Sequence, residues 1–485
     1  MNRGQKLYLV LCGVVSLIGV GLILYARTAA FAWDEGFHLV AAQMIGAGKR
    51  PYVDFCFPQT PLNAYWNAGW MRVFGESWRT AHTVAALLTC GAVMLAADFV
   101  FTRLPVANWR FAAALSAALT VGLNVMVVQF GTIGQAYGLC LFLIVAAFRC
   151  AILAVDRENL LWAAGAGFLA IAAAMSSLLT ALVAPVLLIW ILIYNRAGNR
   201  WTKFAGFVAG AAIPLLPLIW LFAMGPRQVI FGVIQYNLLY RQVHWEGAVR
   251  HDLEVMAAWL DSSQALLLGL LAVTGLLFIY FRSQWDRERR AELYLCGWIP
   301  VALAAIICSA HPTFERYFLL TVPFLAILAA VGLYAIGSRM ISADRPFWPV
   351  LALGVLLAMG LGKSLYDGRD DFSWHDVERL ANKVDEVTPP QGALLADENV
   401  YFVAHRLPPS GMELADSHRL QFPPDFARTM HIISQADLDR RIKAGEFRTV
   451  EMCEDDEKLE ALGLPRLYAQ HFKNDNCEVF WDKVQ

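Results

Sequence analysis

Two adjacent carboxylates, Asp34 and Glu35, follow the first apolar run of the chain, in the stretch Phe31-Ala-Trp-Asp-Glu-Gly-Phe-His. A positioned carboxylate can accept the proton of an attacking hydroxyl group, which is general base catalysis. The pair is equally suited to capping a helix, because carboxylates favour helix N-termini. Their place at the predicted membrane surface, beside Trp33, favours the base. A divalent cation such as Mg²⁺ or Mn²⁺ held by both carboxylates is an alternative, and no cluster of metal ligands is visible in the sequence.

The stretch that follows combines aromatic residues with prolines. Pro58 and Pro61 stiffen the backbone, as a preorganised site requires. The aromatic residues around them predict either an interfacial aromatic belt or a platform on which a sugar ring stacks. Asp54 is either a second acid of the site or a turn former. The candidate substrate-binding residues are Trp33, Tyr52, Asp54, Tyr65, Trp66 and, much later in the chain, His311. His38 and His311 are lone histidines, and we expect a structural role for each.

Arg316 is the first candidate for binding a phosphate group. It lies with Tyr317 at the start of a late apolar run, where a helix N-terminus adds positive potential. A cation there would stabilise a departing phosphate, although an interfacial arginine that only extends its head group to water has the same appearance. The segment 235–245 alternates basic and aromatic residues and suits either a lipid head group or a surface helix. The second-choice cations are Lys49, Arg50, Arg241, His244 and Arg250.

The composition shows which elements must position these residues. Of 485 residues, 58% are hydrophobic and 16% are charged, whereas soluble domains carry about 25% charged residues. A membrane-spanning helix needs about 20 apolar residues. Eleven ranges fit, if the run 160–194 turns back at Met175–Ser177: 7–26, 80–101, 110–128, 133–154, 160–175, 178–194, 202–223, 264–282, 291–309, 316–337 and 346–366. The first is too long for a signal-peptide core and is interpreted as a retained span.

Charge asymmetry tests this count. With eleven spans and a cytoplasmic N-terminus, every short inside loop carries a basic residue, as the positive-inside rule requires. Without the turn at Met175–Ser177, the basic cluster at 282–290 would lie outside. We therefore expect a multi-pass protein of the plasma (inner) membrane with a transmembrane domain over 1–366. Its long segments 27–79 and 224–263 and its C-terminal domain 367–485 are expected on the periplasmic or extracellular side.

The C-terminal segment reads as a soluble α/β domain. Helices are predicted over 372–387 and 435–443, and strands over 392–396, 447–452 and 477–481. Cys453 and Cys477 are its only cysteines, and they can form a disulfide if this domain faces an oxidising compartment. The other cysteines lie in apolar runs and are expected to act as small hydrophobic residues.

The first long segment resembles the type C membrane glycosyltransferases, and within them the protein O-mannosyltransferase and aminoarabinose lipid A transferase group. The resemblance rests on the Asp34-Glu35 pair after span one, the Pro-x-x-Pro-Leu segment from Pro58 to Leu62, and Phe74-Gly75-Glu-Ser. A second match is Arg316-Tyr317 followed by Pro323. The family often has a basic residue before two prolines in this loop, whereas Gln59 and Thr60 stand between the prolines here.

The resemblance implies that Asp34 acts on the acceptor or binds a metal, and that a sugar leaves a polyprenyl phosphate with inversion. The expected partners are a polyprenyl-phosphate sugar donor, a lipid, glycan or protein acceptor, and membrane lipids, with no nucleic acid. A transporter or flippase for lipid-linked sugars is the main alternative, but its spans would carry ionisable groups at mid-bilayer, and few occur here. A non-catalytic envelope assembly factor is the third interpretation.

Overall fold

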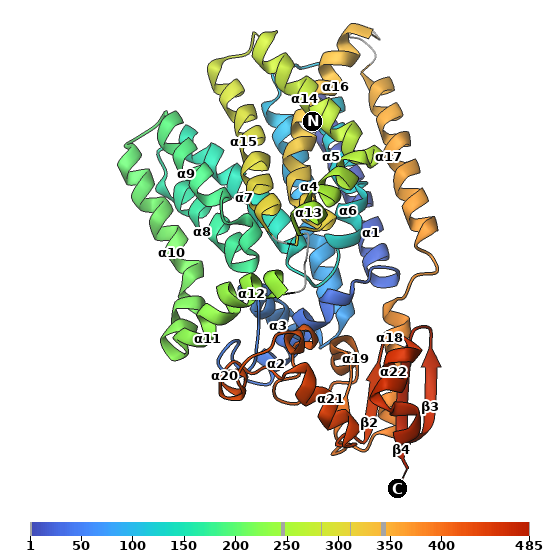
Figure 1. Ribbon diagram of the computed structural model, residues 1–485. Helices are drawn as coiled ribbons and strands as arrows, with labels where there is room; N and C mark the ends of the chain where they lie inside the picture. Colours follow the sequence, from blue (N-terminus) through green and yellow to red (C-terminus); the bar gives the residue numbers. More distant parts are fainter. Residues whose placement is uncertain (1, 244–247, 283, 311, 341–345, 485) are drawn as a thin grey trace. The chain divides into compact units, whose positions relative to one another are not determined.

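The computed structural model describes residues 2–243, 248–282, 284–310, 312–340 and 346–484, with secondary structure as drawn in Figure 1. The chain forms two compact units. The first contains Met1–Thr28, His82–Leu216 and Gly247–Asp370. The second contains Ala29–Ala81, Pro217–Glu246 and Asp371–Gln485. Segments far apart in the sequence therefore pack together within each unit.

The first unit is a bundle of helices, in which α14 packs against α16 and α7 against α8 (Figure 1). Eight of the described helices are long and apolar enough to cross a membrane, and three shorter apolar helices accompany them. Each of the eleven predicted spans falls on one of these helices, so the chain is an integral multi-pass membrane protein. The elements are α1 (Arg3–Thr28), α4 (Trp78–Arg103), α5 (Arg110–Gly122), α6 (Val125–Phe130), α7 (Tyr137–Asp156), α8 (Leu160–Ser176), η2 (Leu178–Thr180), α9 (Val183–Tyr194), α10 (Arg200–Met224), α13 (Ala248–Asp261), α14 (Ser263–Phe281), α15 (Arg287–Ser309), η4 (Glu315–Thr321), α16 (Val322–Met340) and α17 (Phe347–Asp367).

One predicted span is broken. The range 110–128 was expected to be continuous, but α5 ends at Gly122 and α6 begins at Val125. Gln264 satisfies the backbone at the break: its Oε1 accepts the Val125 N–H at 2.9 Å, and its Nε2 donates to the Leu123 carbonyl at 3.2 Å. Non-helical backbone inside an apolar bundle is tolerated only where protein groups bond to it in this way.

The turn predicted within 160–194 is present. The helix α8 ends at Ser176, Ser177 is extended, and α9 begins at Val183. The backbone N–H of Arg196, just after α9, donates to the carbonyl of Val155 near the end of α7 at 3.2 Å. The chain therefore leaves and returns to the same end of the bundle, as two short helices rather than one long helix.

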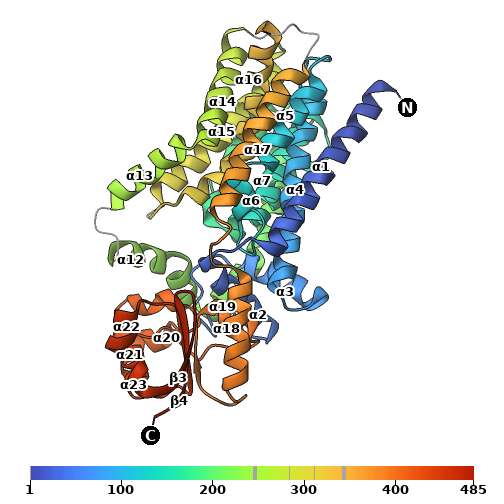
Figure 2. The ribbon, with the colours of Figure 1, turned by 90° about the vertical axis from the view of Figure 1, so that its right-hand side faces the viewer.

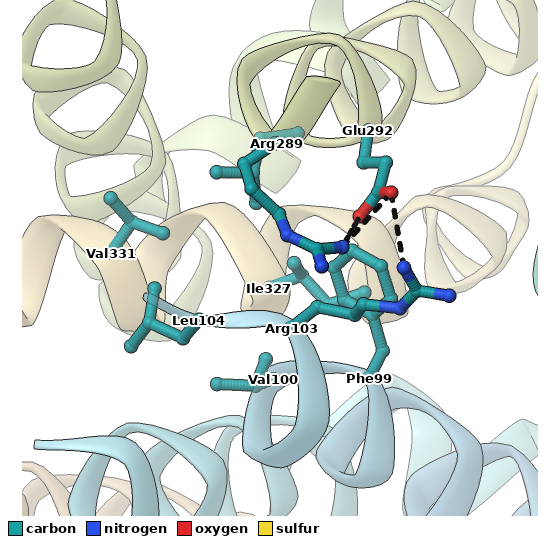
Figure 3. Close-up of a pocket in the computed structure, with 9 residues that line it drawn as sticks. Phe99, Val100, Arg103, Leu104, Arg289, Glu292, Ile327 and Val331 are labelled. Atoms are coloured by element: carbon teal, nitrogen blue, oxygen red, sulfur yellow. Dashed lines mark hydrogen bonds and ion pairs between the residues drawn. The ribbon is translucent and has the colours of Figure 1, made fainter. Parts of the chain in front are cut away.

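A network of ion pairs marks that end of the first unit. Glu292 on α15, whose side chain is 1% exposed, lies 3.4 Å from Arg103 of α4 and 3.0 Å from Arg289 (Figure 3). It also lies 3.6 Å from Arg196. Asp156 at the end of α7 joins the network through Arg103 at 2.9 Å and Arg196 at 2.7 Å. The loops that charge asymmetry assigns to one side of the membrane therefore meet at one end of the bundle.

The second unit contains a four-stranded sheet in the order β1-β2-β4-β3, in which β1 and β2 are parallel and the other neighbours antiparallel. The helix α18 covers one face, and α21 and α22 cover the other (Figure 2). The elements are η1 (Trp33–Glu35), α2 (Gly36–Gly46), α3 (Leu62–Phe74), α11 (Pro226–Ile230), η3 (Phe231–Gln235), α12 (Tyr236–Val243), α18 (Trp374–Val387), β1 (Leu394–Leu395), α19 (Glu398–Val403), η5 (Ala415–Arg419), α20 (Pro424–Thr429), α21 (Gln435–Lys443), β2 (Thr449–Met452), α22 (Asp456–Leu462), α23 (Leu464–Leu467), β3 (Tyr468–Asn474) and β4 (Cys477–Lys483).

The first long segment and the C-terminal segment share one hydrophobic core. Leu39 and Phe55 of the first segment are buried in the same cluster as Leu380 of α18 and Phe402 of α19. Cys453 and Cys477 form the disulfide that the sequence predicts, between the end of β2 and the start of β4. The segment 29–81 is thus part of a folded unit with the C-terminal domain, and this unit holds the candidate acids in place.

Candidate functional site

Asp34 and Glu35 lie in the single 3₁₀ turn η1, immediately before α2. Asp34 is exposed, whereas Glu35 is completely buried. Glu35 occupies the N-cap position of α2, yet its side chain forms no capping hydrogen bond. The capping interpretation is therefore not supported for Glu35. Of the two carboxylates, Asp34 is the one that a substrate in solution can approach.

Aromatic side chains hold this turn on one side. Trp33 is 46% exposed, and its ring stacks on Phe372 with 4.6 Å between the ring centroids. Phe31 packs edge-on against Trp33 at 5.2 Å and also contacts Trp374 at 5.7 Å. Nearly half of Trp33 therefore stays accessible beside Asp34, which suits the predicted contact with a substrate ring.

His38 lies one helical turn beyond Glu35 and is 6% exposed. It stacks on Phe37 at 4.1 Å and meets the edge of Phe57 at 6.2 Å. Burial lowers the pKa of His38 to about 3, because the charged imidazolium would lose its hydration. His38 is therefore neutral at physiological pH, in keeping with the structural role expected for it.

Arg50 and Asp54 bind each other. The guanidinium donates from Nε to Asp54 Oδ2 and from Nη2 to Oδ1, both at 2.8 Å, and the Arg50 backbone N–H donates to Oδ2 at 2.8 Å. These hydrogen bonds lower the pKa of Asp54. The geometry supports the turn-forming interpretation of Asp54. Lys49, by contrast, is exposed.

The aromatic residues of the loop separate into buried and accessible groups. Tyr52, Phe55 and Phe57 are at most 2% exposed, and Tyr52 donates its hydroxyl to the Gln59 carbonyl at 2.5 Å. They form the core beneath the loop rather than a surface on which a sugar stacks. Tyr65 and Trp66, at the start of α3, are only partly buried and stay available for contact with a substrate.

Arg316 belongs to the first unit, in the 3₁₀ segment η4 that leads into α16. Its guanidinium lies over the ring of Phe314 at 4.3 Å and near that of Tyr317 at 5.9 Å. The segment is fixed further by the backbone N–H of Thr313, which donates to Asp252 Oδ1 at 2.8 Å. Aromatic rings thus support a half-buried cation at the start of this segment.

The remaining candidates are less informative. His244 and His311 lie outside the described residues, and the backbone of Arg241 is placed in α12 while its side chain is outside the described part. Arg250 pairs with Glu254 at 2.7 Å on an exposed helix surface. Within the second unit, η3 packs closely on the first long segment, because a Cβ on Gly232 would lie 2.7 Å from the Phe57 carbonyl oxygen.

A metal at the acidic turn finds little support in the side chains around it. Within the described part of the chain, the one group of three ligand-type residues close enough to share an ion is Glu451, Cys453 and Cys477. Its two cysteines are joined in the disulfide. Asp34 is exposed and Glu35 buried, so the pair does not offer a formed ligand set.

The sequence analysis missed a group of polar residues at the carboxyl ends of β1 and β2. Asp397 and Glu451 approach each other there, with the Asp397 N–H donating to Glu451 Oε2 at 2.8 Å. Burial and the charge of Asp397 raise the pKa of Glu451 to about 8. Asn399 follows in the first turn of α19 and contacts the acidic turn of the first segment. The parallel pairing of β1 with β2 brings these ends together, which no local motif reveals.

No family model matches the sequence, and no curated protein matches it either. Among solved structures, the chain is similar to ArnT from Cupriavidus metallidurans bound to undecaprenyl phosphate, with a TM-score of 0.67 and 15% identity over 98% of this chain and 97% of that chain. The apo state of the same protein gives 0.67 and 14% identity over 99% and 98%.

A more distant similarity joins the chain to the archaeal oligosaccharyltransferase AglB from Archaeoglobus fulgidus in complex with an inhibitory peptide and a dolichol-phosphate. The TM-score is 0.51 at 14% identity, over 84% of this chain and 65% of that chain. The chain therefore has the fold of ArnT over nearly its whole length. This confirms the resemblance that the first long segment predicts.

Proposed function

We propose that this chain is a membrane glycosyltransferase that takes a sugar from a polyprenyl-phosphate donor. The observation that carries the proposal is the fold shared over 98% of the chain with ArnT, whose structure contains undecaprenyl phosphate. AglB, the more distant structure, holds a dolichol-phosphate. Both lipids are polyprenyl phosphates, so this lipid class is the donor carrier that we infer. The acceptor is a lipid, glycan or protein hydroxyl or amide group.

Asp34 is the proposed general base. The acceptor hydroxyl oxygen attacks the anomeric carbon, its proton passes to the Asp34 carboxylate, and the bond from the anomeric carbon to the phosphate oxygen breaks. The polyprenyl phosphate leaves with the bonding electrons, and attack opposite to it inverts the anomeric centre. The exposure of Asp34 next to the partly exposed Trp33 supports this role. General base catalysis is worth about 10²–10⁴-fold in rate.

Arg316 is the proposed partner of the donor phosphate. A guanidinium binds phosphate oxygens with two parallel hydrogen bonds and stays charged at every physiological pH. Its contacts with Phe314 and Tyr317 hold the cation in a restricted set of conformations before the donor arrives. Negative charge develops on the phosphate as the sugar leaves, and a preorganised cation stabilises that charge.

The reaction is proposed to occur on the non-cytoplasmic side. The Cys453–Cys477 disulfide lies in the same unit as Asp34, and disulfides persist in oxidising compartments. The basic residues of the ion-pair network lie in loops that the positive-inside rule assigns to the cytoplasm. These two observations support a cytoplasmic N-terminus and a periplasmic or extracellular C-terminal domain.

Purified protein incubated with a panel of polyprenyl-phosphate sugars tests the proposal. We expect release of free polyprenyl phosphate in the presence of an acceptor extract, and its loss in Asp34→Asn. Asn382→Ala, at an exposed position of α18, is the control and should transfer normally. Movement of a lipid-linked sugar across vesicles without cleavage would instead identify a transporter. Failure to bind any polyprenyl phosphate would favour an assembly factor.

A further inference from the structure

The acidic turn is held by one residue of the C-terminal segment, Asn399. Its Nδ2 donates to the Trp33 carbonyl at 3.3 Å and to Asp397 Oδ1 at 2.8 Å. Its backbone N–H donates to the same Asp397 oxygen at 2.9 Å. The side chain is 1% exposed. Asn399 is thus fixed by Asp397 on one side and binds the first residue of η1 on the other.

Gly36 makes this contact sterically possible. A Cβ at Gly36 would lie 2.8 Å from both Cγ and Oδ1 of Asn399 and 2.9 Å from its backbone nitrogen. Real Cβ atoms do not approach other heavy atoms this closely. The backbone of Gly36 is helical, so conformational freedom is not the reason for a glycine here. The absence of a side chain lets α19 pack directly on the residue that follows Glu35.

The hydrogen bonds that hold Asn399 in place extend to the β-sheet through Asp397. Asp397 follows β1, and its N–H is bound by the completely buried Glu451 of β2. The interactions therefore run from the sheet through Asp397 and Asn399 to the carbonyl of Trp33, beside Asp34. This hydrogen bond fixes the backbone of the turn at Trp33, the residue that precedes Asp34.

We propose that Asn399 is a positioning residue that sets the orientation of the Asp34 carboxylate, so that the C-terminal domain completes the acidic turn. The inference rests on the proposed function, in which Asp34 is the base. Asn399 itself touches no substrate. If Asn399 acts by orienting Asp34, mutation of Asn399 should lower kcat in the wild-type protein. The same mutation should have no further effect when residue 34 is no longer a carboxylate.

The first experiment tests the contact without any assay of activity. Gly36→Ala should lower the Tm of the purified protein by at least about 3 °C, because the new methyl group displaces α19. Gly46→Ala is the matched control on the same helix, because a Cβ there meets no atom within 4 Å. It should leave the Tm unchanged or slightly raised. Equal Tm values for both variants would show that η1 and α19 are not in contact, and would overturn the proposal.

The second experiment is a double-mutant cycle on turnover. Asn399→Ala should reduce kcat about tenfold, the size expected for one lost hydrogen bond, with the KM for the polyprenyl-phosphate sugar little changed. Asn382→Ala, an exposed asparagine on α18, is the control and should have normal kinetics. In the Asp34→Asn background, Asn399→Ala should cause no further loss. If Asn399→Ala folds poorly, Asn399→Leu removes the donor with little change in size, without placing a carboxylate against Asp397, and should give the same pattern.

An equal fold-loss from Asn399→Ala in the wild-type and Asp34→Asn backgrounds, or a normal kcat in Asn399→Ala, would overturn the positioning role. Failure of the proposed function looks different, because the wild-type protein itself would then release no polyprenyl phosphate. In that case the positioning role falls with the proposed reaction. The Tm comparison of the two glycine variants would still report whether the contact exists.

Discussion

Asp34 and Glu35 share one 3₁₀ turn, yet Asp34 is exposed and Glu35 is completely buried. Two chemically similar carboxylates therefore have different environments set by the fold around them. An exposed carboxylate can exchange a proton with an arriving acceptor, whereas a buried one contributes mainly to the packing and electrostatics of its unit. The two positions should consequently respond differently to mutation.

The first prediction separates these two roles. Asp34→Asn should lower kcat by at least about a hundredfold, because the amide cannot accept the acceptor proton, while its Tm stays close to that of the wild type. Glu35→Ala should lower the Tm, because it leaves a gap in a fully buried position. Thermal unfolding and transfer kinetics of both variants check this. A normal kcat in Asp34→Asn would remove that residue from the mechanism.

The second prediction concerns the donor. Arg316→Ala should raise the KM for the polyprenyl-phosphate sugar about tenfold or more, since a charged hydrogen bond to the phosphate is lost. Arg316→Lys should be intermediate, because an ammonium group keeps the charge but not the paired hydrogen bonds. Arg369→Ala is the control, as this exposed arginine pairs with Asp370. Unchanged donor affinity in Arg316→Ala would contradict the assignment.

Much of the fold was predictable because hydrophobic runs and helix signals are local. Every predicted span coincides with apolar helix over most of its length, although the range 110–128 is divided between α5 and α6, and the predicted helix 435–443 matches α21. The strand β3 was missed because its burial pattern is mostly exposed, so it lacks the apolar alternation of a half-buried strand. The break at Leu123–Asn124 was missed because its stabilising partner, Gln264, is far away in the sequence.

The candidate site was predictable only in part, for the same reason. The acidic pair and Arg316 stand out by type and position, but exposure depends on tertiary packing. Sequence alone does not distinguish Glu35 from Asp34, or the buried Phe57 from the partly exposed Trp66. The bond from Asn399 to Trp33 joins residues separated by 366 positions in the chain. No sequence motif relates residues that lie so far apart in the chain.

The third prediction is a dependence of stability on pH. Burial and the neighbouring Asp397 raise the pKa of Glu451 to about 8, against about 4.3 in an unfolded chain. Between these values the folded protein holds one more proton, so this contribution is complete below the unfolded pKa and is lost as pH rises through about 8. The free energy of unfolding should fall by about 1 kcal/mol per pH unit in this window.

Glu451→Gln isolates the effect, because the amide stays neutral and can still accept the Asp397 N–H. Its Tm should change less than that of the wild type between pH 6 and pH 8, measured in the same detergent. Glu413, whose pKa burial raises to about 7, adds a slope of the same sign to both proteins, so the difference between them reports Glu451 alone. Identical pH profiles would mean that Glu451 is ionised in the folded protein.

The fourth prediction tests the assembly of the helical unit at Glu292. This side chain is 1% exposed and lies within 3.6 Å of three arginines. Arg103 of α4 and Arg289 of α15 are drawn in Figure 3, and Arg196 belongs to the segment after α9. Glu292→Ala leaves these cations without their shared buried counter-charge, and losing one partner of a buried pair costs about 3–5 kcal/mol. Glu288 also pairs with Arg196, at 2.9 Å, but its side chain is 58% exposed, so Glu288→Ala should cost at most about 1 kcal/mol. Thermal unfolding of both variants in the same detergent measures the contrast. Equal losses would show that the network is as well hydrated as a surface ion pair, and that it does not join the helix ends that meet there.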